Sequence, residues 1–196
     1  SEMCIRDRLF TFPLLVDTEF ILTLWLDKVP PYSVVLCRYV LLFNLFANLS
    51  SVVISGIHAT GKIKRPSIIN GTFYLSVIPY SYVLFKMGGE PQIAYIYNIF
   101  AVVCGMLSNI WTLHLFIPSF SLKKYFTNIL CKILLVGSIV LLLTYIFSLC
   151  FEVGWIRLFC ITSFSTILLL LATYYILMDS QEKKQVIMKI KQICNV

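Results

Sequence analysis

Long runs of apolar residues, each separated from the next by a short polar break, dominate the chain. A helix that crosses a membrane needs about 20 mostly apolar residues. The breaks between the runs carry glycine, proline or charged residues, which are typical of helix ends. We therefore predict six spans, at Leu9–Leu26, Tyr32–Ile57, Ser67–Phe85, Gln92–Phe116, Tyr125–Leu149 and Trp155–Met178.

The breaks are short, so successive helices should run in opposite directions. The predicted fold is an all-α integral membrane protein, an antiparallel bundle of six transmembrane helices over residues 9–178. The first run is short and contains Asp17 and Glu19. These two residues are either carboxylates that couple transport to a cation or residues at a helix break near the outer surface.

Composition supports the membrane assignment and excludes several other classes. The 196 residues are 59% hydrophobic and 13% charged, against about a quarter charged in a soluble domain, and the net charge is +7. We expect no nucleic-acid partner, because the basic residues do not gather on one soluble face. The seven cysteines lie singly and His58 and His114 are isolated. We therefore expect no metal, no cofactor and no catalytic set.

The basic residues lie mostly in breaks at one side of the predicted bundle. Nine fall on that side and three on the other, so the positive-inside rule predicts that the nine-residue side and the C-terminus are cytoplasmic. The nine are Lys62, Lys64, Arg65, Lys123, Lys124, Lys183, Lys184, Lys189 and Lys191, and the three are Lys28, Lys86 and Arg157. Residues 179–196 are predicted to form a basic amphipathic helix on anionic membrane lipids. Residues 1–8 are expected to be a foreign prefix, because Met3 follows two other residues.

The stretch "GIHATGKI", residues 56–63, nearly matches the phosphate-binding loop of nucleotide hydrolases. Ile63 stands where that motif requires Ser or Thr, and Gly56 ends a predicted membrane helix where the motif follows a strand. We interpret the stretch as a helix end followed by a turn. In this interpretation Gly61 is left-handed, Lys62, Lys64 and Arg65 lie at the negative end of the helix dipole, and Pro66 starts the next span.

Polar residues inside the spans are costly in lipid, so the faces that they share are informative. A stripe on the second span either lines a cavity or forms hydrogen bonds between helices. Its members are Ser33, Cys37, Asn44, Asn48, Ser51, Ser55 and His58. The third span has four polar residues on one side, Ser67, Asn70, Tyr74 and Ser81, and a kink is expected at Pro79. The fourth carries a stripe of mostly small residues that favours close helix packing, namely Ala94, Asn98, Ala101, Gly105, Asn109 and Thr112.

Arg38 is a basic residue well inside a predicted span. Facing a cavity, its guanidinium would hold a diphosphate or a sugar acid. Facing lipid, it would extend toward the membrane surface. It lies off the polar stripe, which favours the second interpretation.

The sequence resembles the C-terminal half of Wzx-type polysaccharide flippases, which belong to the superfamily of the multidrug and toxic-compound extruders. The resemblance covers residues 9–180 or so, and "ATGKIK" and "ILTLWL" are its most specific parts. It is carried by Thr18, Glu19, Ile21, Leu22, Leu24, Trp25, Leu26, Pro30, Ala59, Thr60, Gly61, Lys62, Ile63, Lys64, Pro79, Ser81, Tyr82, Lys86, Gly88 and Pro91.

The resemblance implies one lobe of a two-lobed transporter in the bacterial inner membrane, with the N-terminal half missing. Its substrate would be a lipid-linked oligosaccharide for lipopolysaccharide or capsule biosynthesis, moved without a cofactor. The substrate-cavity candidates are Arg38, Asn44, Asn48, Ser51, Ser55, Asn70 and Tyr74, and the family-motif turn comprises Ala59, Thr60, Gly61, Lys62 and Lys64. The alternatives are a drug or cation antiporter of the same superfamily, a small membrane scaffold, and a membrane-embedded glycosyltransferase or acyltransferase.

Overall fold

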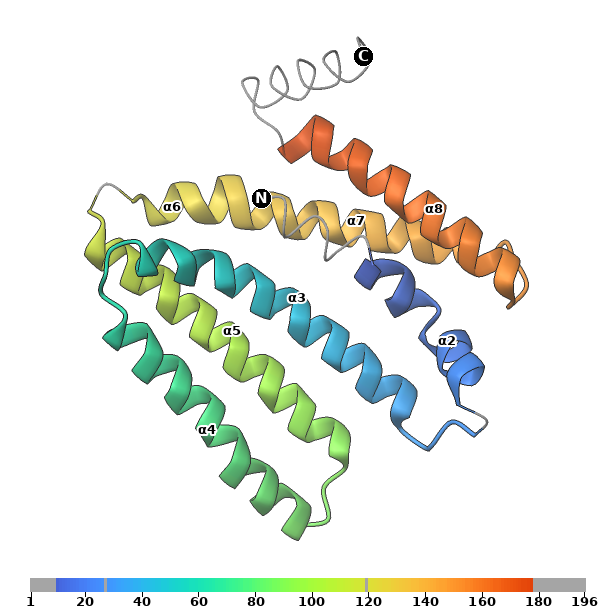
Figure 1. Ribbon diagram of the computed structural model, residues 1–196, viewed down its shortest axis with the longest axis horizontal. Coiled ribbons are helices and arrows are strands. Elements are labelled where there is room, and N and C mark those ends of the chain that lie inside the picture. The colour runs from blue at the N-terminus through green and yellow to red at the C-terminus, as the bar shows by residue number, and fades with distance from the viewer. Residues whose placement is uncertain (1–9, 27, 119, 178–196) are drawn as a thin grey trace. The chain divides into compact units, whose positions relative to one another are not determined.

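The computed structural model describes residues 10–26, 28–118 and 120–177, and these residues form helices and turns without any strand. The predicted all-α class is therefore confirmed. The expected prefix and the expected amphipathic tail lie outside the described residues. The elements of Figure 1 are α2 (Thr18–Trp25), α3 (Ser33–His58), α4 (Lys64–Lys86), α5 (Pro91–Phe116), α6 (Leu122–Tyr125), η1 (Phe126–Leu130), α7 (Cys131–Ser148), α8 (Trp155–Ala172) and η2 (Thr173–Leu177).

Five helical stretches are long and apolar enough to cross a membrane, which indicates a membrane-embedded protein. They are Ser33–His58, Lys64–Lys86, Pro91–Phe116, Leu122–Ser148 and Trp155–Ile176. The predicted second to fifth spans agree with the first four of these within about one helical turn. The predicted end of the last span, Met178, lies outside the described residues.

The predicted first span, 9–26, is divided by a bend at Asp17. Residues 10–16 form one short helix, and α2 begins at Thr18. Neither piece has the length of a span, so the described residues contain five candidate spans where the sequence predicted six. A helix break, one of the two interpretations of these carboxylates, lies at Asp17, whereas Glu19 lies in the first turn of α2. Asp17 is buried and Glu19 is exposed.

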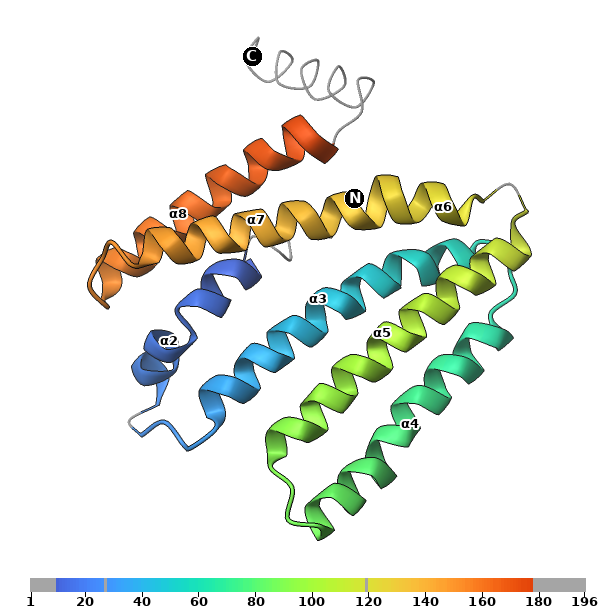
Figure 2. The same cartoon turned by 180° about the vertical axis from the view of Figure 1, so that it is seen from behind.

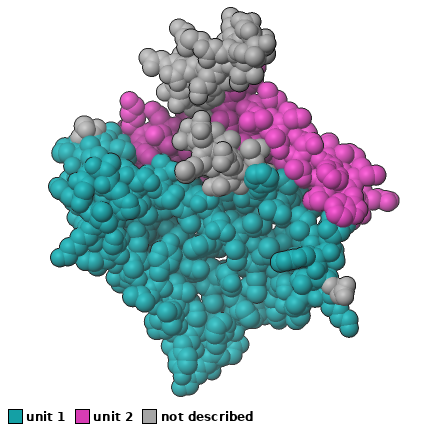
Figure 3. Space-filling model, viewed as in Figure 1, with its two compact units in different colours: residues 1–122 teal, residues 123–196 magenta. Residues whose placement is uncertain are grey.

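The chain forms two compact units, residues 1–122 and residues 123–196, which are coloured separately in Figure 3. In unit 1, α5 lies between α3 and α4 and contacts both helices. Figures 1 and 2 show that α3 and α5 run in the same direction and that α4 runs in the opposite one. The core of this layer is apolar and includes Leu49, Val53, Ile57, Ala101, Val102, Met106, Ile110 and Leu113.

Glycines in left-handed conformation shape the two turns that flank α4. Gly61, between α3 and α4, has φ +74°, as the sequence predicted. Gly88, after α4, has φ +77°, and the N–H groups of Gly88 and Gly89 donate to the carbonyls of Phe85 and Leu84. This pairing caps the last carbonyls of α4 and turns the chain into α5. Helix α4 continues through Pro79.

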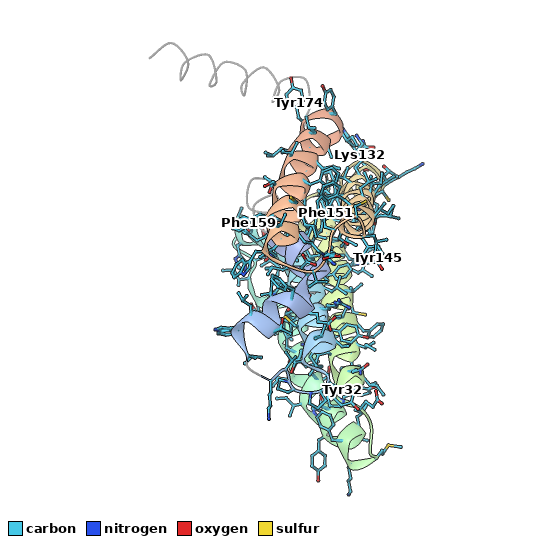
Figure 4. All side chains as sticks on the ribbon, turned by 90° about the vertical axis from the view of Figure 1, so that its right-hand side faces the viewer. Tyr32, Lys132, Tyr145, Phe151, Phe159 and Tyr174 are labelled. Carbon is cyan, nitrogen blue, oxygen red and sulfur yellow. The ribbon has the colours of Figure 1, made fainter. Side chains whose placement is uncertain are left out.

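Unit 2 contains α7, which packs against α8. Each helix buries every fourth residue along one face. The buried residues are Val136, Val140, Thr144 and Ser148 on α7, and Ile161, Ser165, Leu169 and Thr173 on α8 and η2. The rings of Phe147 and Phe164 stack with centroids 4.2 Å apart, which marks a contact between the helices. Figure 4 labels Lys132 and Tyr145 on α7 and Phe159 on α8, all of which are exposed.

Candidate functional site

The polar stripe of α3 lies away from the helix face that is buried. At about 100° per residue, the buried residues Leu49, Val53 and Ile57 are roughly opposite Asn44 and Ser55. Asn44, Ser51, Ser55 and His58 are exposed, and Ser33, Cys37 and Asn48 are half-buried. The stripe is therefore not the surface through which α3 packs on α5.

Two serine hydroxyls of this stripe form hydrogen bonds within the described residues, whereas its side-chain amides do not. The Ser51 hydroxyl donates to the Asn48 carbonyl at 2.8 Å, and the Ser55 hydroxyl donates to the Ser51 carbonyl at 2.9 Å. These bonds lie within α3 itself, and such hydroxyls are tolerated facing lipid. The side-chain amides of Asn44 and Asn48, one helical turn apart near the middle of α3, make no hydrogen bond within the described part of the chain.

A second polar group ties the three helices of unit 1 together. Asn109 on α5 is fully buried, and its side-chain nitrogen donates to the Ser50 hydroxyl of α3 at 3.3 Å and to the Asn70 oxygen of α4 at 3.1 Å. The Asn70 nitrogen in turn donates to the Asn109 oxygen at 3.4 Å. We call Ser50, Asn70 and Asn109 the amide cluster. It accounts for Asn70 as a residue that joins helices.

The small-residue stripe of α5 permits this close approach. Ala101, Gly105, Asn109 and Thr112 are all buried, which confirms the close packing that the sequence favoured. A Cβ atom added at Gly105 would lie 3.0 Å from the Asn70 oxygen. Glycine at this position therefore leaves room for the amide cluster.

A cavity of about 50 Å³ adjoins the amide cluster. Ser50, Asn70 and Tyr74 supply polar atoms to its wall, and the remaining walls are apolar, formed by Ala47, Ile54, Phe73, Ala101, Val102 and Gly105. The space admits a water molecule and is too small for a sugar ring. Tyr74, a predicted cavity residue, thus borders an internal space but remains 46% exposed.

Farther along the same interface, tyrosines join α4 to α5. The hydroxyls of Ser76 and Tyr97 lie 3.0 Å apart, and the ring of Tyr80 stacks on that of Tyr97 with centroids separated by 3.9 Å. None of these three residues was among the predicted site residues. The signal was present, because Tyr97 lies one helical turn before Ala101, on the side of α5 that carries the small residues.

The family-motif turn forms a separate site at the end of α3 and the start of α4. Gly56 lies inside α3, and α3 continues to His58, so the near-match to a phosphate-binding loop has a helix on its N-terminal side. Lys64 and Arg65 lie in the first turn of α4, which corrects their expected place at the end of the preceding helix. The Lys62 ammonium lies 4.8 Å from the centroid of the Phe116 ring.

An open hollow of about 600 Å³ lies at this turn. Its lining combines cations with apolar side chains, namely Gly61, Lys62, Ile63, Lys64, Arg65, Ile68, Ile69 and Phe116. Among the described residues, no carboxylate lines it. Ala59 and Thr60, also in the motif, lie beside the hollow in sequence, and the Thr60 hydroxyl donates to the Ile57 carbonyl at 2.7 Å.

The remaining candidates do not join either cluster. Arg38 is exposed on α3, off the polar stripe, and its role as a diphosphate ligand stays a prediction. His58 is exposed, and the His114 ring nitrogen Nδ1 lies 2.7 Å from the Phe120 carbonyl. Among the described residues, no three His, Cys, Asp or Glu side chains come together as metal ligands.

Comparison of the chain with protein-family models, curated proteins and solved structures gives no match.

Proposed function

We propose that this chain is the C-terminal, six-helix portion of a Wzx-type flippase of the bacterial inner membrane, with its C-terminus in the cytoplasm. Its substrate would be an oligosaccharide repeat unit on a polyprenyl diphosphate, moved to the outer leaflet for polysaccharide biosynthesis. The similarity of residues 9–180 to such flippases motivates the proposal. The five membrane-length helices are consistent with it.

The observation that carries the proposal is the pair of amides at Asn44 and Asn48. Both lie in the middle of a 26-residue apolar helix, on the side opposite its buried face, and neither side chain forms a hydrogen bond within the described residues. A side-chain amide without a partner is costly in hydrocarbon. These amides therefore need water, a polar ligand or another protein segment beside them.

A sugar-binding cavity satisfies that need. Side-chain amides donate and accept hydrogen bonds, and sugar hydroxyls do both as well. The hydroxyls of Ser51 and Ser55 on the same face still have acceptor capacity, because their protons are used within α3. The lipid tail would remain in the bilayer while the sugars occupy this wet face.

Transport by this route needs no bond chemistry. In alternating access, two lobes rock about a site near the middle of the membrane, and the substrate is exposed to one side at a time. The chain would supply one lobe, and the rest of the protein the other. The turn at residues 56–63 is not assigned to ATP, so the driving force would come from an ion gradient or from consumption of the product.

One observation favours the cation antiporter as a second candidate. Asp17 is 3% exposed at the bend between residues 10–16 and α2. A buried carboxylate in a membrane protein is a common element of proton or cation pathways. Antiport would require that Asp17→Asn abolishes transport, whereas a flippase without ion coupling would tolerate that change.

The test is a flipping assay on the whole protein that contains this chain. It would be placed in liposomes with a fluorescent lipid-linked oligosaccharide, and external quencher would report exposure. Replacing both amides, Asn44→Leu with Asn48→Leu, should slow exposure at least about fivefold, since each lost hydrogen bond contributes about 0.5–1.5 kcal/mol. Asn128→Leu, an exposed asparagine of η1, is the matched control.

Two results would contradict the proposal. One is an unchanged flipping rate in the double variant, which would leave the amides as contacts to protein alone. The other is no acceleration by the unaltered protein over empty liposomes with any lipid-linked glycan, while a fluorescent organic cation is exported. That second result would support the antiporter.

A further inference from the structure

The hollow at the start of α4 is distinct from the polar face of α3 and has a different chemistry. Three cations, Lys62, Lys64 and Arg65, line it together with the apolar side chains of Ile68, Ile69 and Phe116. All three cations are exposed, and none forms an ion pair within the part of the chain that the structure describes. The hollow thus offers three uncompensated charges above an apolar wall.

The geometry points to a binding groove for an anionic phospholipid, whose phosphate meets the three cations and whose first acyl carbons lie along Ile68, Ile69 and Phe116. The groove lies at one end of two membrane-length helices, where the headgroups of the adjacent leaflet are found. Its volume of about 600 Å³ accommodates a headgroup and the start of a chain.

Charge placement supports an anion at this position. Lys64 and Arg65 lie in the first turn of α4, where the helix dipole is positive and cations are disfavoured. The residue before the helix, Ile63, has no polar group with which to cap it. A lipid phosphate in the groove would offset this repulsion. The groove therefore complements a headgroup with net negative charge better than it complements a neutral or zwitterionic headgroup.

Lys62 is held in a defined place beside the apolar wall. Its ammonium lies over the Phe116 ring, 4.8 Å from the ring centroid. The turn between α3 and α4 and the end of α5 therefore both contribute to the groove. Gly61, with φ +74°, sets the path of the turn that carries Lys62. Any anionic lipid of that leaflet would bind, whatever substrate the protein carries.

The test is lipid binding by the whole chain in a mild detergent, measured by native mass spectrometry. Phosphatidylglycerol should bind more tightly than phosphatidylcholine, and the variant Lys62→Gln with Lys64→Gln and Arg65→Gln should lose that preference. We expect each charge removed to weaken phosphatidylglycerol binding roughly fivefold, so the single change Lys62→Gln should already be measurable. Circular dichroism would confirm that each variant keeps its helix content.

The matched control removes the same charge elsewhere, by Lys86→Gln, Lys123→Gln and Lys124→Gln. It should change the binding less than twofold. Equal weakening by the two triple variants would overturn the inference in favour of general charge attraction. Equal binding of the two lipids would also overturn it. Displacement of the lipid by inorganic phosphate at millimolar concentration would make the groove a soluble-anion site and would reject a lipid.

Discussion

The α3–α5–α4 layer of unit 1 and the α7–α8 pair of unit 2 both bury polar side chains, but their hydrogen-bond partners differ. In unit 1, Asn109 bonds to side chains on two other helices. In unit 2, the hydroxyls of Thr144 and Ser165 bond to carbonyls of their own helices, Val140 at 2.7 Å and Thr162 at 3.1 Å. One interface joins helices by amides, and the other buries hydroxyls that need no neighbour.

This difference follows from what each side chain can satisfy alone. A hydroxyl reaches back to the carbonyl three or four residues earlier, so it can be buried beside any apolar neighbour. An amide has two donors and two acceptor sites and cannot satisfy them on its own helix. Asn109 therefore specifies which helices lie beside α5 and how they are aligned along its axis. By the same reasoning, Asn44 and Asn48 require a partner beyond the described hydrogen bonds.

The largest expected effect comes from removing the amide at the centre of the cluster. Asn109→Leu would leave Ser50 and Asn70 without their partner and would force a bulkier shape into a fully buried position. We expect the free energy of unfolding to fall by about 2–4 kcal/mol. Titration with a denaturing detergent, followed by circular dichroism, measures it. A loss below about 0.5 kcal/mol would mean that the amides do not specify the layer.

The next effect tests the space that glycine leaves for the cluster. In Gly105→Ala, the new methyl would meet the Asn70 oxygen at 3.0 Å, so that amide must move. Gly71→Ala, also within a helix of unit 1, meets nothing within 4 Å. We expect Gly105→Ala to destabilise by about 1 kcal/mol and Gly71→Ala to stabilise by about 0.5–1 kcal/mol, because alanine favours helix. The same detergent titration compares them, and equal effects would contradict the role of Gly105.

Much of this layer could be predicted from sequence because its signals are local. The lengths of the apolar runs predicted α3, α4 and α5, and a single glycine after a helix, Gly61, predicted the left-handed turn. The recurrence of small residues every three or four positions along α5 predicted its buried stripe. Each of these signals depends on the period of one helix and on one residue type.

The rotation of α3 could not be predicted, because it depends on which neighbours a helix has. The seven residues of the polar stripe indicated either a cavity lining or a face that joins helices. The contact with α5 is made by the opposite face, where Ser50 is the polar member. The spacing of Leu49, Ser50, Val53 and Ile57 is that of one helix face, but other faces of this span are also apolar, so the spacing alone does not single out Ser50.

A smaller effect is expected from the aromatic contact of unit 2. The rings of Phe147 and Phe164 stack at 4.2 Å between α7 and α8. A double-mutant cycle with Phe147→Leu and Phe164→Leu should give a coupling free energy of about 0.5–1.5 kcal/mol. Phe159→Leu, on an exposed face of α8, is the control and should not couple to Phe147→Leu. A coupling free energy equal to that of the control would mean that the stacked rings do not stabilise the contact between α7 and α8.

The smallest expected effect is the most direct test of self-satisfied hydroxyls. Thr144→Val keeps the shape of a fully buried side chain and removes only a hydroxyl whose proton already bonds to the carbonyl of Val140. We expect a change within about 0.5 kcal/mol, whereas removing a cross-helix partner, as in Ser50→Ala, should cost about 1 kcal/mol. Both are measured by detergent titration. A loss above about 1 kcal/mol for Thr144→Val would show that this hydroxyl serves a second helix. The contrast between amide and hydroxyl interfaces would then fail, and the hydroxyls of Ser51 and Ser55 would need partners beyond α3, as the amides of Asn44 and Asn48 do.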